Sequence, residues 1–401
     1  MSPRPRRWRR RLALAALAAL LADQAVQWTV LRDGWLAGRR IAPFDPPLFH
    51  AAQHAARERL AALARGETPA GPPRNVRLDA ELGWAPEPGS AAGDYRYDAS
   101  GARVGASGPL PPTRTPGVRR VVALGCSFTH GDEVAGDRTW CSRLDEARAD
   151  LELANLGVGG YGADQALLRL RRDGLPLRPD EVWFGLLPAA AARVTTLYRP
   201  AERHHDPSVG FKPRFVLDGG ALRRVPCPAP DAEAALHLLT DQRAFAAACR
   251  EDAWVARWPA AYAPQGSHPA HWFAGTRLLL TELEAGGRDV SAALRDPQGE
   301  VRRLLSALVL ALRDTARAAG AGFRLLLLPD RAALNEAAAG TPSWAGLADE
   351  LSAAGVAVMD LSPALAGACL DAALWQPGGH WGPELHAAVA RVLASLPPQP
   401  P

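Results

Sequence analysis

A serine, a glycine-rich loop and a histidine occur in that order at positions where they could do chemistry. Ser127 lies in VVALGCSFTHG (121–131), whose apolar start predicts a buried strand that ends at the serine. NLGVGGYG (155–162) follows, and GGHW places His380 just before the last predicted helix. Serine is a poor nucleophile until a base takes its proton, and His380 is the candidate base.

This order resembles that of the SGNH, or GDSL-type, hydrolase superfamily. In that family the first strand ends in G-D-S-L/F, a second block supplies an oxyanion glycine, and a late D-x-x-H block supplies the histidine. GCSF, with Cys126 in the aspartate's place, resembles the first block, NLGVGGYG the second and GGHW the last. The resemblance implies an exported serine esterase or O-acyl(acetyl)transferase. Ser127 would be acylated, His380 would shuttle the proton, and Gly160 would hold the oxyanion.

Two polar residues of the family have no counterpart. The asparagine of the third block is expected after EVWFGLLP (181–188), where four alanines (189–192) stand instead. The aspartate is expected two or three residues before the histidine, where Gly378 and Pro377 stand. In serine proteases, loss of the orienting acid lowers turnover by about 10^4, and loss of one oxyanion donor lowers it by about 10^2–10^3. These departures predict a slow enzyme unless other groups compensate.

Several residues could compensate. Asp371 could fold back to orient the imidazole of His380, or a backbone carbonyl could do so and leave a Ser–His dyad. Arg193, just after the alanines, could approach the vacant donor position, as could His130 or Asp132 in the loop after the serine.

A second hypothesis is a degenerate hydrolase that keeps the fold and serves as a glycan-binding or assembly component. The alanine run and Gly378 favour this hypothesis, whereas the intact Ser127, Gly160 and His380 favour catalysis. Membrane-tethered relatives in the family often act on O-acetyl groups of cell-envelope polysaccharides. The resemblance therefore implies a small acyl ester or an acetylated glycan as the partner.

The N-terminus has the pattern of a membrane-targeting segment. Six arginines lie in the first eleven residues, and an apolar stretch follows and resumes to Leu31. Residues 12–31 are long enough for about one bilayer span, and the arginines favour a cytoplasmic N-terminus. We expect a signal anchor in the inner membrane with the body in the periplasm or extracytoplasmic space. A cleaved signal sequence is the alternative.

Composition and sequence patterns argue against several other kinds of binding partner and cofactor. The net charge is +4, and without the six N-terminal arginines it is about −2, so no basic body for nucleic acid is predicted. The five cysteines have no metal-ligand spacing, although one or two disulfides could form in an exported protein. No phosphate-binding or dinucleotide glycine pattern occurs, so we expect neither a metal nor another cofactor.

Alternating strand and helix patterns predict an α/β fold, a three-layer α/β/α sandwich around a five-stranded parallel sheet of flavodoxin-like type. We expect a targeting segment (1–31), a lead helix with two short accessory strands (32–116) and an SGNH hydrolase-like domain (117–396). An irregular insertion is expected at about 188–295, with a hairpin within 210–228. The predicted sheet strands are 119–125, 151–156, 180–187, 323–329 and 356–361. The predicted helices are 50–65, 138–149, 163–172, 301–319, 341–354 and 383–396.

Overall fold

The centre of the protein is one sheet of five parallel strands in the order β13-β12-β9-β7-β8. The computed structural model describes residues 5–31, 35–36, 39–40, 51–67, 76–202, 210–257, 273–276, 279 and 289–399. The strands are β7 (Arg119–Gly125), β8 (Leu151–Asn155), β9 (Glu181–Leu186), β12 (Gly322–Leu327) and β13 (Ala357–Asp360). The predicted strands are confirmed, with ends that differ by one or two residues.

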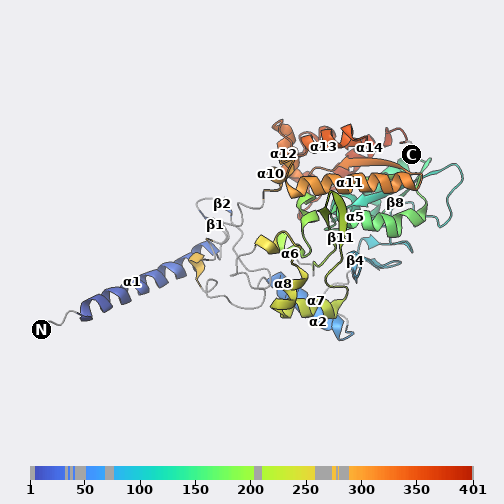
Figure 1. The fold of residues 1–401 in the computed structure, drawn as a ribbon. Helices are drawn as coiled ribbons and strands as arrows, with labels where there is room; N and C mark the ends of the chain where they lie inside the picture. Colours follow the sequence, from blue (N-terminus) through green and yellow to red (C-terminus); the bar gives the residue numbers. More distant parts are fainter. Residues whose placement is uncertain are drawn as a thin grey trace.

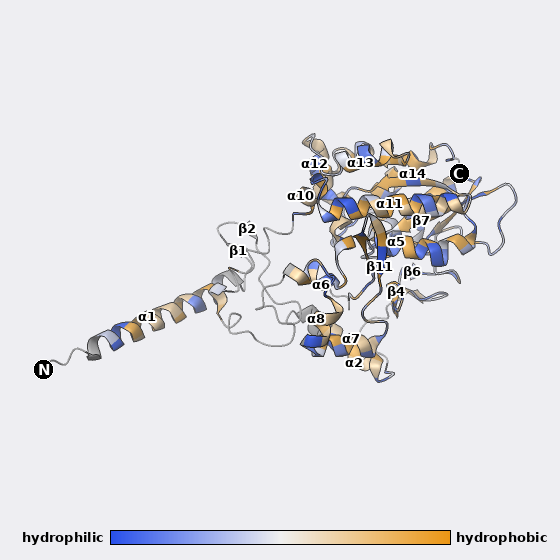
Figure 2. Ribbon diagram, viewed as in Figure 1, coloured by the Kyte–Doolittle hydropathy of each residue, from blue (hydrophilic) through white to orange (hydrophobic). Residues whose placement is uncertain are grey.

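Helices cover both faces of this sheet (Figure 1). One face packs against α5 (Ala163–Arg169), α11 (Glu300–Ala318) and α13 (Ala345–Ala353). The other packs against α4 (Trp140–Ala147) and α14 (Pro383–Ala394). Strands buried on both faces need nearly continuous apolar sequence, as in VVALG and LLL, and Figure 2 shows this hydrophobic interior. The predicted α/β/α sandwich is confirmed.

Some helices were not predicted. Two of them are α3 (Ser127–His130) and α12 (Arg331–Ala338). The segment predicted as one helix over 341–354 begins only at Ala345. Short 3-10 or π turns make the remaining connections of the sandwich: η2 (Gly136–Arg138), η3 (Leu170–Gly174), η4 (Leu175–Leu177), η9 (Pro363–Leu365), η10 (Ala368–Leu370) and η11 (Ala372–Leu374).

The segment before the sandwich forms two small antiparallel pairs rather than the two strands expected. They are β3 (Val76–Asp79) with β4 (Gly83–Pro86), and β5 (Ala91–Ala92) with β6 (Tyr95–Arg96). Tight turns interrupt the aromatic stretches that looked like longer strands. The lead helix is confirmed as α2 (Ala51–Ala64), and it packs against α7 of the insertion.

The insertion is more ordered than the irregular segment that the sequence predicted. The hairpin is confirmed as β10 (Arg214–Asp218) and β11 (Ala221–Val225), with Gly219 and Gly220 at positive φ in its turn. Its other elements are η5 (Pro188–Thr195), α6 (Arg199–Glu202), α7 (Ala232–Thr240), α8 (Gln242–Ala248), η6 (Val255–Arg257) and α10 (Val290–Arg295). Alanine-rich runs at helical spacing account for most of the helices missed.

At the N-terminus, α1 (Pro5–Val26) continues into the π turn η1 (Gln27–Leu31). Within the described residues, Trp8–Thr29 is the one helical stretch long and apolar enough to cross a membrane. Figure 1 shows α1 extending away from the body. The short strands β1 (Trp35–Leu36) and β2 (Arg39–Arg40) follow.

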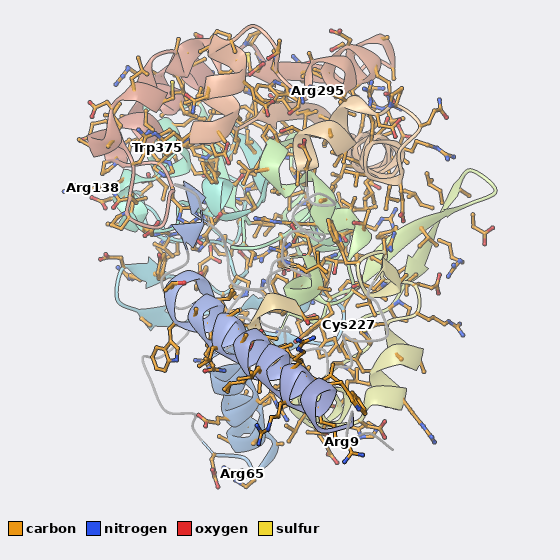
Figure 3. The ribbon with its side chains drawn as sticks, turned by 90° about the vertical axis from the view of Figure 1, so that its left-hand side faces the viewer. Arg9, Arg65, Arg138, Cys227, Arg295 and Trp375 are labelled. Carbon is orange, nitrogen blue, oxygen red and sulfur yellow. The ribbon has the colours of Figure 1, made fainter. Side chains whose placement is uncertain are left out.

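All five cysteines are buried and free, so the disulfides considered from the sequence do not form in this structure. Burial raises the pKa of the Cys227 thiol to about 11, so this thiol stays protonated at neutral pH. Figure 3 labels it in the insertion. Cys126 is buried beside the serine, as its place at a strand end predicted.

Candidate active site

Ser127 is the first residue of the short helix α3, directly after strand β7. The bend between strand and helix needs Gly125, because a Cβ there would lie 2.2 Å from Thr129 Oγ1 and 2.6 Å from the Gly185 carbonyl oxygen. Gly131, at φ 82°, ends the helix. The Ser127 amide, as the first of its helix, has no intrahelical acceptor. The strand end therefore presents both a hydroxyl and a free amide.

His380 lies in a tight loop just before α14. Its backbone carbonyl accepts a hydrogen bond from the Gln376 amide at 2.8 Å, and Trp375 and Trp381 form a β-bridge across the loop. The Trp381 indole donates to the Pro329 carbonyl at 3.0 Å, which anchors the loop to the end of β12. Residues 126–135, which carry the candidate nucleophile Ser127 as well as Glu133, are called the nucleophile loop below. Figure 3 shows Trp375 on the same side of the molecule as Arg138, which follows this loop.

The acid beside His380 is Glu133, from the loop after the serine. His380 Nδ1 lies 2.5 Å from Glu133 Oε2, and the Gly378 amide donates to Glu133 Oε1 at 2.9 Å. One carboxylate therefore fixes both the imidazole and the loop that carries it. Glu133 adopts φ 66°, which is unusual for a residue with a side chain.

The sequence-based search for this acid looked in the wrong place. Asp371 is exposed, and its carboxylate accepts the Ala373 amide at 2.9 Å, so it caps its own turn instead of reaching His380. The dyad held by a backbone carbonyl is also wrong, because Glu133 occupies the acid's position. No signal in the sequence pointed to Glu133. The structure shows that a Cβ on Gly378 would lie 2.5 Å from Glu133 Oε2, so the glycine makes room for this carboxylate.

The imidazole of His380 also contacts the residue next to the serine. Its ring centroid lies 5.5 Å from that of Phe128. Among the described residues, neither Ser127 Oγ nor His380 Nε2 has a hydrogen-bond partner. With Nδ1 on the carboxylate, Nε2 remains the nitrogen that can exchange a proton with a substrate or with the serine.

Gly160 has the backbone that an oxyanion loop needs. Its φ is +83°, and a Cβ there would lie 3.2 Å from Cζ2 of Trp84. Its amide has no hydrogen-bond partner in the described part of the chain. Within residues 157–162 the amides of Gly157, Val158, Tyr161 and Gly162 donate to acceptors in the protein, so the amides of Gly159 and Gly160 are the two free donors of this loop among the described residues.

Arg193 helps to hold this loop. It is buried at 8% exposure, and its Nη1 donates to the Tyr161 carbonyl at 3.0 Å. On the opposite side, the Trp84 indole donates to the Gly159 carbonyl at 3.0 Å. The structure thus places Arg193 at the glycine loop, in contact with its backbone.

The alanine run brings no side-chain donor to the end of β9. Ala189 is exposed there, and Ala190 to Ala192 are buried. This stretch therefore offers an oxyanion no side-chain donor, and the free backbone amides of Ser127 and Gly160 are the donors considered below.

His130 is committed to internal contacts. Its Nδ1 is hydrogen-bonded to Asp132, and its Nε2 lies 2.8 Å from the Tyr97 hydroxyl. Burial lowers its pKa in spite of the attraction of Asp132. Burial also pushes the pKa of Asp132 upward, but His130, with a smaller contribution from His380, outweighs this and holds it below its usual value.

Arg103, from the accessory segment, fixes the loop that carries Glu133. Its guanidinium donates to the carbonyls of His130 at 2.6 Å, Gly131 and, at 2.5 Å, Val134. Its own amide donates to the Asn155 carbonyl at 2.9 Å, at the end of β8. Because these groups are buried, Arg103 joins the accessory segment to both the nucleophile loop and the glycine loop.

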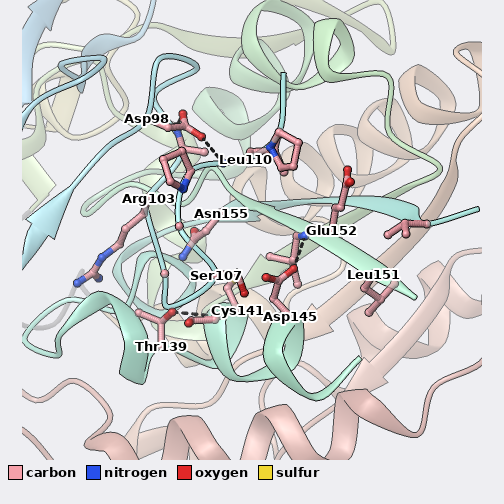
Figure 4. Close-up of a pocket in the computed structure, with 18 of the residues that line it drawn as sticks. Asp98, Arg103, Ser107, Leu110, Thr139, Cys141, Asp145, Leu151, Glu152 and Asn155 are labelled. Atoms are coloured by element: carbon pink, nitrogen blue, oxygen red, sulfur yellow. Dashed lines mark hydrogen bonds between the residues drawn. The ribbon is translucent and has the colours of Figure 1, made fainter. Parts of the chain in front are cut away.

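A cavity of about 330 Å³ lies behind this region, between edge strand β8, helix α4 and the accessory segment (Figure 4). Its polar groups are already used: Asp98 accepts the Ala102 amide at 3.0 Å, and Asp145 accepts the Leu153 amide at 2.9 Å. Neither Ser127 nor His380 lines it. We interpret it as a structural gap under the accessory segment.

No metal centre is evident within the described ranges, where no group of three or more His, Cys, Asp and Glu side chains is arranged to hold an ion.

No protein-family model and no curated protein matches the sequence. Several solved structures match at low similarity. A protein from Desulfitobacterium hafniense DCB-2, described as lipolytic and of the G-D-S-L family, is 12% identical, covers 69% of this chain and 97% of its own, and has a TM-score of 0.35. A protein from Bacteroides fragilis NCTC 9343 described as an acylhydrolase is 14% identical over 71% and 88%, with a TM-score of 0.33.

A catalytic mutant of an acetylxylan esterase from Geobacillus stearothermophilus is 11% identical, covers 71% of this chain and 98% of its own, and has a TM-score of 0.25. These proteins are of the kind that the sequence motifs resemble. At such scores they carry no argument about activity, which rests on the geometry of Ser127, His380 and Glu133.

Proposed function

We propose that this protein is a serine esterase or O-acyltransferase that acts through Ser127, His380 and Glu133. The observation that supports it most is the 2.5 Å contact between His380 Nδ1 and Glu133 Oε2. A carboxylate on Nδ1 selects the tautomer whose Nε2 can take a proton and stabilises the imidazolium that results. It supplies the acid that the last sequence motif lacks.

In the first half of the reaction, Ser127 Oγ attacks the ester carbonyl carbon while its proton passes to His380 Nε2. The amides of Ser127 and Gly160 donate to the oxyanion of the tetrahedral intermediate. The intermediate collapses, the alcohol leaves with the proton from Nε2, and Ser127 is left acylated. Electrons and protons balance without a further reactant.

In the second half, water or an alcohol gives its proton to His380 Nε2 and attacks the acyl carbon. Collapse of the second intermediate returns the proton to Ser127 Oγ and releases an acid or a new ester. Exclusion of water from the site favours transfer over hydrolysis. Because two backbone amides serve without a third side-chain donor, we expect slower turnover than in an enzyme with three donors.

The signal anchor remains part of the proposal. The apolar helix Trp8–Thr29 and the arginines before it are consistent with an inner-membrane anchor and a periplasmic body. An acetylated cell-envelope polysaccharide is the macromolecular substrate that the sequence resemblance favours.

The test is p-nitrophenyl acetate turnover by the full chain beside Ser127→Ala and His380→Ala, with Ser395→Ala and His237→Ala as controls. We expect both site variants to lose activity and both control variants to keep it. Activity that persists in Ser127→Ala would contradict the proposal.

A degenerate hydrolase that binds a glycan or assists assembly is the second candidate, and the exposed Ala189 in place of a donor is the observation that favours it. Gly378 no longer favours it, because the glycine accommodates Glu133. Saturable binding of acetylated polysaccharide by a chain inactive on every ester would support this candidate.

A further inference from the structure

A cleft of about 710 Å³ lies beside the catalytic loops. The strands β3 and β4 and the residues around β6 form one wall, and the C-terminal half of α2 and the start of α7 form another. Its remaining boundary comes from the glycine loop and the nucleophile loop. Parts of the chain before the sandwich, in its loops and in the insertion therefore meet there.

Aliphatic and aromatic side chains make up most of the lining of this cleft, and Arg59, Arg77, His130, Asp132 and Asp231 are its charged or titratable members. Leu63 of α2 is 39% exposed and Val76 of β3 is 40% exposed, so both present apolar surface at this cleft. Leu78, Val158 and Ala232 extend the same apolar lining. Water in such a cleft is readily displaced by hydrocarbon, because burial of apolar surface is favourable.

Three aromatic side chains complete the walls, and their polar tips are used inside the protein. The Trp84 indole donates to the Gly159 carbonyl, and the Tyr97 hydroxyl lies 2.8 Å from His130 Nε2. The Tyr95 hydroxyl accepts the Glu133 amide at 2.9 Å, and the guanidinium of Arg103 lies 4.7 Å from the centre of its ring.

These contacts favour an alkyl ligand over a sugar. Tyr97 stacks on His130 at 5.8 Å and is only 6% exposed, so it has no open face for a pyranose ring. Tyr95 has the Arg103 guanidinium over its ring. Sugar recognition also needs hydrogen-bonding groups, and the hydroxyls of both tyrosines and the carboxylates of Asp132 and Asp231 already have partners. Arg77 pairs with Glu87, which leaves Arg59 as the charged donor of the lining among the described residues.

The inner end of the cleft adjoins the reacting groups. Gly159 and Asp132 both line it, and each directly precedes a residue of the proposed site, Gly160 and Glu133 respectively. The two touch, since a Cβ on Gly159 would lie 2.8 Å from Asp132 Oδ2. If the Gly160 amide binds the carbonyl oxygen of an ester, an alkyl group attached to that ester therefore lies next to this cleft.

We propose that the cleft binds an unbranched alkyl chain of the ester substrate. The proposal rests on the proposed function, since it concerns the substrate of the same site. It predicts a higher kcat/KM for a long-chain ester than for a simple acetate ester, with the alkyl group in either the acyl or the alcohol half. Each methylene buried should strengthen binding by up to about fourfold.

The first experiment measures kcat/KM of the full chain in lipid nanodiscs. One arm compares p-nitrophenyl decanoate with p-nitrophenyl acetate, and the other compares decyl acetate with ethyl acetate. The proposal expects a preference of at least tenfold for the long chain in one arm, and that arm identifies which half of the ester occupies the cleft. Equal rates in both arms would overturn it while leaving the esterase function intact.

Variants of exposed lining residues locate the effect. Val76→Gln and Leu63→Gln put an amide in the apolar wall without removing a buried side chain, so folding should be preserved. Each is expected to lower the long-chain preference by about four- to tenfold with acetate turnover unchanged. Leu370→Gln, at a leucine 83% exposed outside the cleft, is the matched control and should keep the preference.

A second readout does not depend on turnover. The Ser127→Ala chain is irradiated with a ten-carbon fatty acid that carries a terminal diazirine, and the labelled peptides are mapped by mass spectrometry. Label at 76–79 or 230–232 that excess decanoate removes, and that Val76→Gln weakens, is expected. Label spread over the surface, or not removed by decanoate, overturns the alkyl site even if every ester assay is silent.

Discussion

Glu133 Oε2 lies 2.5 Å from His380 Nδ1, although the two residues are 247 positions apart in the chain. Ser127, by contrast, lies close to Glu133 in the sequence. It is the first residue of the short helix α3, and Glu133 follows three residues after that helix ends at His130. The nucleophile and the acid thus arrive together from the end of β7, and the histidine arrives alone from the C-terminal loop.

Replacement of Glu133 by Gln should abolish most activity without unfolding the chain. The amide keeps the shape of the side chain but no longer stabilises the imidazolium, and it can present its NH₂ group to Nδ1. We expect kcat to fall by about 10^3–10^4, by analogy with the acid of serine proteases. Ester turnover checks this, with Glu146→Gln, an exposed glutamate on α4, as the control. A loss below tenfold would show that His380 works without this acid.

Gly378→Ala should weaken the same contact between Glu133 and His380, because it changes the loop that carries the histidine. The added methyl would lie 2.5 Å from Glu133 Oε2, and the glycine does not have a positive φ, so the backbone itself tolerates alanine. The carboxylate must then move, and we expect kcat to fall by about tenfold or more while thermal stability changes little. Wild-type turnover in this variant would mean that the carboxylate has room to shift without losing Nδ1.

Gly160→Ala should weaken the oxyanion loop. Alanine at φ +83° costs about 1–2 kcal/mol, and its methyl would press on Trp84, so the amide should turn away from the reacting oxygen. Loss of one donor lowers kcat by about 10^2–10^3. Gly340→Ala has a similar φ of +72° with nothing within 4 Å and should lose stability alone. Equal activity in both variants would exclude Gly160 as a donor.

Lys212→Met should destabilise the fold by about 3–5 kcal/mol, because it leaves a carboxylate unpaired in the core. Lys212, the only lysine of the chain, is fully buried in an ion pair with Asp164, and it joins the insertion to the helix after the glycine loop. Urea unfolding measures the loss.

The double variant Lys212→Met/Asp164→Leu should recover most of this loss, since it removes both charges. Arg223→Met breaks the exposed pair with Glu251 and should cost less than about 1 kcal/mol. A double variant no more stable than Lys212→Met would show that the pair itself, and not the unpaired carboxylate, provides the stability.

His386 should make the fold sensitive to acid. Burial lowers its pKa to about 3, and its Nδ1 accepts the Trp140 amide at 3.2 Å, so the ring is neutral in the folded state. The unfolded chain binds this proton below a pKa of about 6.5, so stability falls as pH drops from there toward 3. Between pH 7 and 5 the loss from this group is about 2 kcal/mol.

Urea unfolding of His386→Gln at the two pH values checks this. The variant should be less stable at pH 7 and should lose about 2 kcal/mol less on acidification. His237→Gln, at an exposed histidine, should follow the wild type. An unchanged pH dependence in His386→Gln would assign the acid sensitivity to other groups.

The fold could be predicted from the sequence because its strands are short apolar runs that end at or just before a glycine, a polar residue or a proline. VVALG and LELAN each read as a buried strand, and each forms one. The accessory strands could not be predicted in this way. The positions of strands of two to four residues are determined by their turns and by contacts such as that of Trp84 with the glycine loop.

The candidate site was predictable where a motif is local and not where it depends on contact across the chain. Ser127, Gly160 and His380 each lie in a recognisable segment, and the structure places each at the end of a strand or in a loop beside the sheet. Glu133 was missed because nothing in T-H-G-D-E-V indicates which carboxylate will face a distant histidine. Only the packing of Gly378 against it determines that choice.

The carboxylate on the serine's own loop has a consequence for how such proteins are found. A search that requires an aspartate just before the histidine passes over any chain in which the acid has moved to another loop. Because Nδ1 needs a carboxylate within reach and not at a set position in the sequence, Glu133 can contact His380 although no aspartate stands just before the histidine.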